Sequence, residues 1–227
     1  TTQAIAKEYE KALRAKVGES LKSVRAAPPL EEVTTASLPA LRKYAEAMEL
    51  SDKTGNAPRV EALLREAIAL DTSFAMAWRK LGIILGNSGG SYAAQVDALT
   101  HAFNHRDRLG PIERNMAAGA YYNQVAGRDD DALAAYEAIL DIDSTNYVAL
   151  NNAAIIYQDK RQPAKAAEYL KRAARTRPAW NAWGNLAIAQ FRLGDTSGSL
   201  RTLDTAIARF PANPGPLRIR SELGKAE

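Results

Sequence analysis

The chain has 227 residues, of which 46% are hydrophobic and 25% are charged, and its formal net charge is +4. It contains no cysteine, which excludes a disulfide framework and thiol chemistry, and no apolar run approaches the roughly 20 residues of a membrane-spanning helix. Acidic and basic residues alternate along most segments, so the small excess of positive charge does not predict a nucleic-acid surface.

Residues 1–36 are expected to form a helix followed by a linker. Ile5, Tyr9 and Leu13 place an apolar stripe on one helical face. The pair Pro28-Pro29 then predicts an extended segment, because a residue that precedes a proline avoids the helical conformation. Ser37 is a predicted N-cap of the next helix.

From this point to residue 213 the sequence repeats with a period of about 34 residues. Trp78-x-x-Leu81-Gly82 and Trp183-x-x-Leu186-Ala187 are the same phrase in two of the repeats. Glycine recurs where the two helices of a repeat would turn, and proline near the end of a repeat. We predict five helical hairpins, at about 41–74, 75–112, 113–146, 147–179 and 180–213, and a C-terminal capping helix within 214–227. The predicted turn glycines are Gly55, Gly89-Gly90, Gly127 and Gly194, and the predicted terminal prolines include Pro178 and Pro211.

This pattern resembles the tetratricopeptide repeat (TPR) family. The resemblance implies an all-α, right-handed α-solenoid in which the first helix of each hairpin lines a concave groove. It implies a protein or peptide partner in that groove and no built-in catalytic pocket. We therefore expect a non-catalytic binding scaffold that needs no cofactor.

Further phrases resemble the carboxy-terminal TPR region of bacterial transmembrane serine/threonine kinases. They are the segments 13–21, 29–38, 102–109 and 149–157. The resemblance implies that this chain is a regulatory or sensor region of a larger signalling protein. It also implies that this region lies outside the cytoplasm, on the far side of a membrane helix from the kinase. Thr1 is not a methionine, which fits a fragment of a longer protein, and none of the kinase motifs is present.

Several sequence patterns resemble metal-binding or phosphate-binding motifs but lack an essential residue. His101 and His105 have the spacing of a zinc pair without the glutamate of a zincin, and Gly82–Ser91 lacks the lysine of a phosphate loop. Asp141–Asn146 lacks the glycine and closing glutamate of a calcium loop. Asp129–Asp131 is expected to cap the helix that follows it. We predict no catalytic, cofactor or metal site.

The candidate binding residues are polar side chains at outward positions of the predicted first helices. They are Arg79, Arg114, Tyr121, Gln124, Asn151, Asn152, Gln158, Asn181, Asn185 and Arg192. For Asn152 and Asn185 the rival interpretation, which we favour, is a hydrogen bond between hairpins. The carboxylate clamp of chaperone-type TPR domains is not predicted, because Ile83 and Ala118 occupy two of its asparagine positions.

Two alternative functions stay open from the sequence. The first is a small-ligand sensor, suggested by the long second repeat and the unusual N-terminal segment. The second is homo-oligomerisation through an exposed patch that Trp180, Phe191 or the C-terminal cap would supply.

Overall fold

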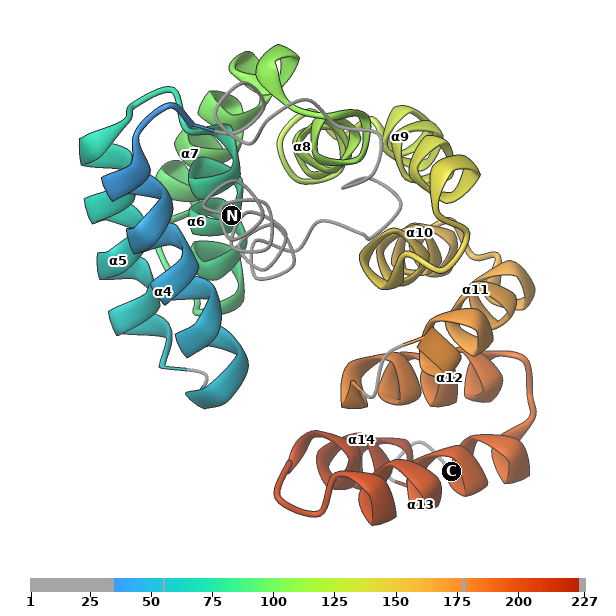
Figure 1. The fold of residues 1–227 in the computed structure, drawn as a ribbon. Helices are drawn as coiled ribbons and strands as arrows, with labels where there is room; N and C mark the ends of the chain where they lie inside the picture. Colours follow the sequence, from blue (N-terminus) through green and yellow to red (C-terminus); the bar gives the residue numbers. More distant parts are fainter. Residues whose placement is uncertain (1–34, 55, 177–178, 225–227) are drawn as a thin grey trace, which may run out of the picture. The chain divides into compact units, whose positions relative to one another are not determined.

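The computed structural model describes residues 35–54, 56–176 and 179–224. This part of the chain contains eleven α-helices and one short 3₁₀ helix, and no strand (Figure 1). The prediction of an all-α solenoid of helical hairpins is confirmed. The expected N-terminal helix and linker before residue 35, and also Gly55 and Pro178, lie outside the described residues.

The chain divides into two compact units, with the boundary between Asp143 and Ser144. Unit 1 contains three hairpins, in which α4 packs on α5, α6 on α7 and α8 on α9. Their bounds are α4 Leu38–Thr54, α5 Ala57–Leu70, α6 Ala75–Asn87, α7 Tyr92–Asn104, α8 Pro111–Gln124 and α9 Asp129–Ile142. A 3₁₀ turn, η1 (Arg106–Arg108), lies between α7 and α8.

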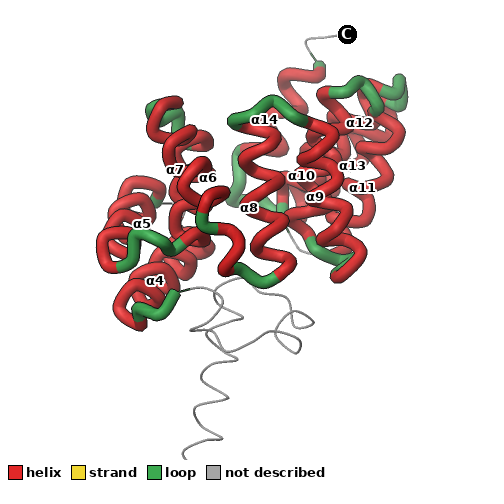
Figure 2. The backbone as a smooth tube through the Cα atoms, turned by 90° about the horizontal axis from the view of Figure 1, so that it is seen from above, coloured by secondary structure: helices red, strands yellow, loops and turns green. Residues whose placement is uncertain are grey.

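Unit 2 contains two hairpins and one further helix, which takes the place of the predicted cap. The first hairpin is α10 (Tyr147–Asp159) with α11 (Pro163–Thr176), and the second is α12 (Trp180–Arg192) with α13 (Thr196–Arg209). The last helix is α14 (Gly215–Leu223), which packs against both α12 and α13. Figure 2 shows that only short loops separate the helices in the described chain.

Polar side chains fix where many of these helices begin. The predicted cap at Ser37 is present, because its hydroxyl accepts a hydrogen bond from the Ala40 N–H at 3.3 Å. Asn56, Ser91, Asn146 and Asp195 have the same role at α5, α7, α10 and α13. Such a cap stabilises a helix by about 0.5–2 kcal/mol.

The expectation that Asp129–Asp131 cap α9 is wrong in its detail. The cap residue is Arg128, and no side chain accepts a cap hydrogen bond there. Asp131 binds the Arg128 Nε at 2.6 Å, and Asp129 accepts from Asn123 Nδ2 at 3.2 Å. The carboxylates still lie in the first turn of α9, where their charge favours the positive end of the helix dipole.

Among the hairpin turns that the structure describes in full, one differs from the others. Gly89, Gly127 and Gly194 have φ angles of 69°, 63° and 81° at the predicted glycine turns. In the hairpin of α10 and α11 the left-handed residue is Arg161, at φ 55°. A residue with a Cβ atom pays about 1–2 kcal/mol for this conformation, so the turn at Arg161 carries strain that the glycine turns avoid.

The core of unit 1 follows the repeat pattern. Tyr44, in the predicted Trp position, is buried and its ring centroid lies 5.1 Å from that of Phe74. Burial raises the pKa of Tyr44 to about 12. Gly82 is a close-packing residue, since a Cβ atom there would lie 2.7 Å from the Leu99 side chain. The half-buried Trp78 packs against the same core.

In unit 2 the helix α14 covers one end of the core. Ala187, Leu203 and Ile219 are buried together, and Trp180 packs against them. A Cβ atom on Gly215 would collide with the Trp180 ring, so this glycine lets α14 approach α12 closely. Trp180, one of the residues suggested for an exposed patch, is thus half-buried against the capping helix.

Candidate peptide-binding face

Hydrogen bonds join α10 to α12 at a constant sequence separation. The Tyr147 hydroxyl donates to Asn181 Oδ1, Asn185 Nδ2 donates to Asn151 Oδ1 at 3.2 Å, and Arg192 Nη1 donates to Gln158 Oε1 at 3.2 Å. Each pair is 34 residues apart in the chain. The sequence therefore sets one fixed register between two helices that run in the same direction.

The spacing along each helix explains why these side chains meet. Tyr147, Asn151 and Gln158 are separated by four and seven residues, which places them on one face of an α-helix. Their partners on α12 have the same spacing. Three bonds thus hold about 16 Å of the two helices together. We call this surface of α10 and α12 the polar face, and define it by Asn151, Asn152, Ile155, Gln158, Asn181, Asn185, Ile188 and Arg192.

Gln158 connects the end of the polar face to the α12 backbone. Its Nε2 donates to the carbonyl oxygen of Asn185 at 3.3 Å, while its Oε1 accepts the bond from Arg192. The amide group is therefore satisfied on both sides and its orientation is fixed. Arg192 itself is exposed, so most of its five N–H groups face solvent.

The residues of the polar face differ in how far their side chains are exposed to a binding partner. Asn151 is only 7% exposed, and its accepting oxygen is already occupied by Asn185. The Asn185 side chain forms the bond between hairpins that we favoured for it, and Asn152 is half-buried and also has a partner. Gln158, Asn181 and Ile188 are half-buried, whereas Arg192 and Ile155 are exposed, Ile155 by 37%. The accessible part of the face is thus apolar at Ile155 and cationic at Arg192.

The other four candidate residues belong to unit 1, where they contact their own surroundings. Arg114 Nη2 donates to the carbonyl oxygens of Asp107 and Leu109, and so fastens the loop before α8. Tyr121 stacks on Phe103, with ring centroids 4.2 Å apart. Gln124 Oε1 accepts from Gln95 Nε2 at 2.7 Å, and Arg79 is half-buried. Within unit 1 these residues form separate local contacts and no common network among the described contacts.

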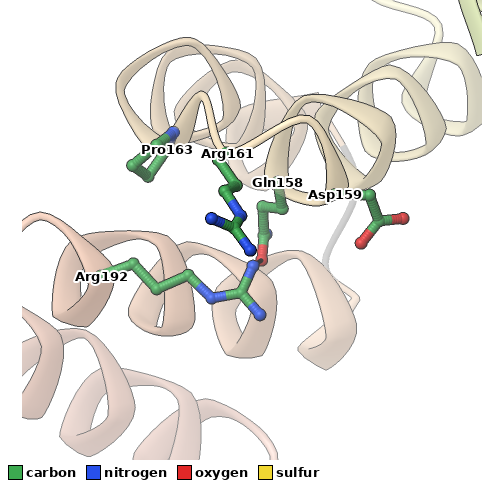
Figure 3. Close-up of a pocket in the computed structure, with 5 residues that line it drawn as sticks. All are labelled: Gln158, Asp159, Arg161, Pro163 and Arg192. Carbon is green, nitrogen blue, oxygen red and sulfur yellow. Dashed lines mark hydrogen bonds between the residues drawn. The ribbon is translucent and has the colours of Figure 1, made fainter.

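A cavity lies at the carboxyl ends of α10 and α12 (Figure 3). Its volume is about 510 Å³, and its lining, which we call the arginine pocket, consists of Gln158, Asp159, Arg161, Pro163 and Arg192. Figure 3 shows the Arg161 and Arg192 side chains directed toward Gln158. Gln158 and Arg192 were predicted from the sequence, and Arg161 was not. The signal was an arginine at a turn where the other hairpins carry glycine.

The two histidines have a structural environment. His101 stacks on the indole of Trp78 with ring centroids 4.4 Å apart, and its Nε2 lies 3.6 Å from Asp97. Nowhere in residues 35–54, 56–176 and 179–224 do three or more histidine, cysteine or acidic side chains gather in a way that holds a metal ion. None of the helices in that same part combines the length and the apolar character needed to cross a membrane.

Comparison with known proteins identifies the fold. No family model and no curated protein matches the sequence. Among solved structures, the chain is similar to TTC0263, a thermophilic TPR protein of Thermus thermophilus, with a TM-score of 0.62 and 16% identity over 82% of this chain and 98% of that one. It is also similar to PilW, a type IV pilus biogenesis factor, with a TM-score of 0.60 and 20% identity over 82% and 85%.

A third similar structure is the Cut9–Hcn1 hetero-tetramer of the APC/C, with a TM-score of 0.58 and 16% identity over 93% of this chain and 39% of that one. The class that the fold defines is thus the all-α solenoid of TPR-type helical hairpins. At these identities the likeness shows the fold alone.

Proposed function

We propose that this chain is a non-catalytic module that binds a protein or peptide, and that the polar face of unit 2 receives an extended segment of the partner. The observation that carries the proposal is the fixed register of α10 and α12, which three hydrogen bonds hold at one separation. A preformed surface binds with less loss of conformational entropy than one that must become ordered.

The chemistry of the face suits an extended peptide. Asparagine and glutamine side chains carry more donors and acceptors than the bonds between α10 and α12 use, and those left over, such as the Asn181 Nδ2 group, match the groups of a peptide backbone. Ile155 and Ile188 add apolar area between the polar positions. Among proteins with this fold, Cut9 assembles with Hcn1 in a hetero-tetramer, which supports an interaction role for the hairpin architecture.

We further propose, on the resemblance of segments 13–21, 29–38, 102–109 and 149–157 to bacterial kinase regions, that the module is the regulatory or sensor part of a larger signalling protein. An upstream kinase domain and membrane helix in the full gene product would support this context. A full-length protein without either would refute it and leave the binding proposal unchanged.

The binding proposal is tested with an array of short peptides probed with the full chain. Ile155→Glu places a bulky charge on the polar face at a position that is 37% exposed, so the fold should tolerate it. The matched control is Ile142→Glu, at the end of α9 in unit 1, where the isoleucine is 40% exposed. Peptides captured by the native chain should lose at least about tenfold in affinity for the first variant and keep their affinity for the second.

Equal binding by both isoleucine variants would reject the polar face as the site. Thermal melting followed by circular dichroism shows whether each variant is folded, so that a loss of binding is not confused with a loss of structure.

A further inference from the structure

The arginine pocket carries more positive than negative charge. Its ionisable groups are Arg161, Arg192 and Asp159, which give it a net charge of one positive. In the described part of the chain neither guanidinium forms an ion pair, and the one side-chain hydrogen bond from them to the lining is that from Arg192 to Gln158. In Figure 3 Asp159 lies on the far side of Gln158 from Arg161. Among the described residues, the two cations therefore lack a paired counter-charge.

The backbone at Arg161 indicates that the side chain has a use beyond the turn. Glycine adopts a positive φ without strain, and the corresponding turns have it at Gly89, Gly127 and Gly194. Arg161 adopts the same conformation with a Cβ atom. A cation near the carboxyl end of a helix interacts favourably with the helix dipole. This interaction explains a positive charge near the end of α10, but it does not explain why a residue with a Cβ atom occupies the left-handed position. Strained residues of this kind gather at functional sites.

Gln158 prepares the pocket for an anion. Its amide is held by the Asn185 carbonyl, and it in turn holds Arg192 through Nη1. The remaining N–H groups of Arg192 are free to form the paired bonds that a guanidinium makes to a carboxylate. Arg161 extends into the cavity from the wall opposite Arg192, at the turn before Pro163 (Figure 3).

We propose that the arginine pocket binds a carboxylate group of an acidic peptide that lies along the polar face. This inference rests on the proposed function and specifies which kind of partner the face accepts. One carboxylate neutralises the net charge of the pocket, whereas a doubly charged phosphate would leave it with one negative charge. The carboxylate has two sources, an Asp or Glu side chain and a free peptide C-terminus.

Three pools of short randomised peptides separate these sources. The first has a fixed central Glu and an amidated C-terminus, the second has Gln in place of that Glu, and the third has the Gln and a free C-terminal carboxylate. Fluorescence anisotropy measures the binding of each pool to the native full chain, to Arg161→Gly and to Arg161→Lys. Arg161→Gly installs the residue that the other turns use, so it should fold at least as well as the native chain. Arg201→Ala, an exposed arginine on α13, is the matched control.

The expected result is that the native chain and Arg201→Ala prefer one carboxylate pool over the Gln pool by about tenfold or more, because hydrogen bonds to charged groups are the stronger ones. Arg161→Gly should lose that preference and bind the Gln pool as the native chain does. Arg161→Lys should recover part of it, since lysine keeps the charge without the planar fork. The pool that shows the preference identifies the source.

Each contrary result has its own meaning. Binding of all pools without a carboxylate preference overturns the arginine pocket and leaves the proposed function standing. If no pool binds, titration with N-acetylglutamate amide decides between the two proposals. Shifts of the Arg161 and Arg192 Nε–H signals in the NMR spectrum then retain the pocket and reject the peptide-binding face, and unchanged signals reject both.

Discussion

Units 1 and 2 are built from the same helical hairpins but use their first helices differently. In unit 1 the outward side chains of α6 and α8 contact separate neighbours, as Arg114 does with its loop and Tyr121 with Phe103. In unit 2 the corresponding side chains of α10 and α12 bond to one another at a constant separation of 34 residues. A repeat architecture therefore determines which faces are outward, and the individual side chains determine whether a face becomes one connected surface.

The turns show the same contrast. Unit 1 has glycine at the left-handed positions Gly89 and Gly127, and unit 2 has Gly194 in one hairpin and Arg161 in the other. The arginine pocket lies beside the Arg161 turn, and the carboxyl end of α12 supplies Arg192 to it. The departure from the repeat pattern and the candidate site thus coincide in one segment.

The largest expected effect is the loss of stability on truncating a core leucine, and it tests whether the two units unfold independently. Leu203 is fully buried in the core of unit 2, so Leu203→Ala should lower the free energy of unfolding by about 2–5 kcal/mol. Hydrogen exchange should show the loss of protection mainly in α10 to α14. The matched variant is Leu64→Ala in unit 1, also fully buried, which should act mainly on α4 to α7. An identical exchange pattern for the two variants would mean that the units unfold together.

Exchanging the turn residues sharpens the comparison between hairpins. Gly127→Arg places a side chain in a left-handed conformation and should destabilise unit 1 by about 1–2 kcal/mol. Arg161→Gly should be neutral or stabilising by up to about 1 kcal/mol, because the relief of strain is partly offset by the entropy of glycine in the unfolded chain. Urea unfolding measures both. A destabilised Arg161→Gly would show that the arginine supports the fold.

The side-chain network of unit 2 is tested by removing one amide. Asn185→Ala leaves the buried oxygen of Asn151 without its partner, so stability should fall by about 1–3 kcal/mol. Gln124→Ala in unit 1 removes a bond to the half-buried Gln95, which water can replace, and should cost less than about 1 kcal/mol. Similar losses in urea unfolding would argue against a special role of the connected polar face.

The smallest effect concerns acid stability, and it is confined to unit 1. Burial acts to raise the pKa of Asp71, but hydrogen bonds from Thr35 and Ser73, together with the charge of Arg108, outweigh it and hold the pKa below its ordinary value. A carboxylate with a lowered pKa stabilises the fold above the unfolded-state value, and this contribution disappears as the pH falls through the folded-state value. Urea midpoints at about pH 7 and about pH 3 should therefore differ more for the native chain than for Asp71→Asn. Equal differences would remove Asp71 as the source.

The periodicity of the sequence was sufficient to predict much of the fold. Trp78 and Gly82 are packing residues as predicted, and Gly89, Gly127 and Gly194 are left-handed turns, because each follows from a backbone or volume requirement that few residue types satisfy. Contacts that depend on the three-dimensional approach of distant segments were not predictable. The position of Trp180 under α14 depends on the close approach that Gly215 allows, which no local pattern reveals.

The candidate site could be predicted from the sequence only in part. Gln158, Asn185 and Arg192 were found because their spacing places them on outward helix faces. Their mutual hydrogen bonds depend on the register between α10 and α12, which a single helix pattern does not contain. Arg161 was missed because its one signal, an arginine at a turn where the other hairpins carry glycine, does not by itself show a positive φ angle or a pocket.

The left-handed turn at Arg161 makes this position a point of conflict between selection for folding and selection for binding. In a library that varies residue 161, a protease-resistance screen should enrich glycine, which suits the backbone. A screen for capture of a carboxylate-bearing peptide should enrich arginine, which supplies the charge. Opposite rankings at one position are the sign of a trade-off between stability and activity. The residue present in the chain is the one that the second screen would choose.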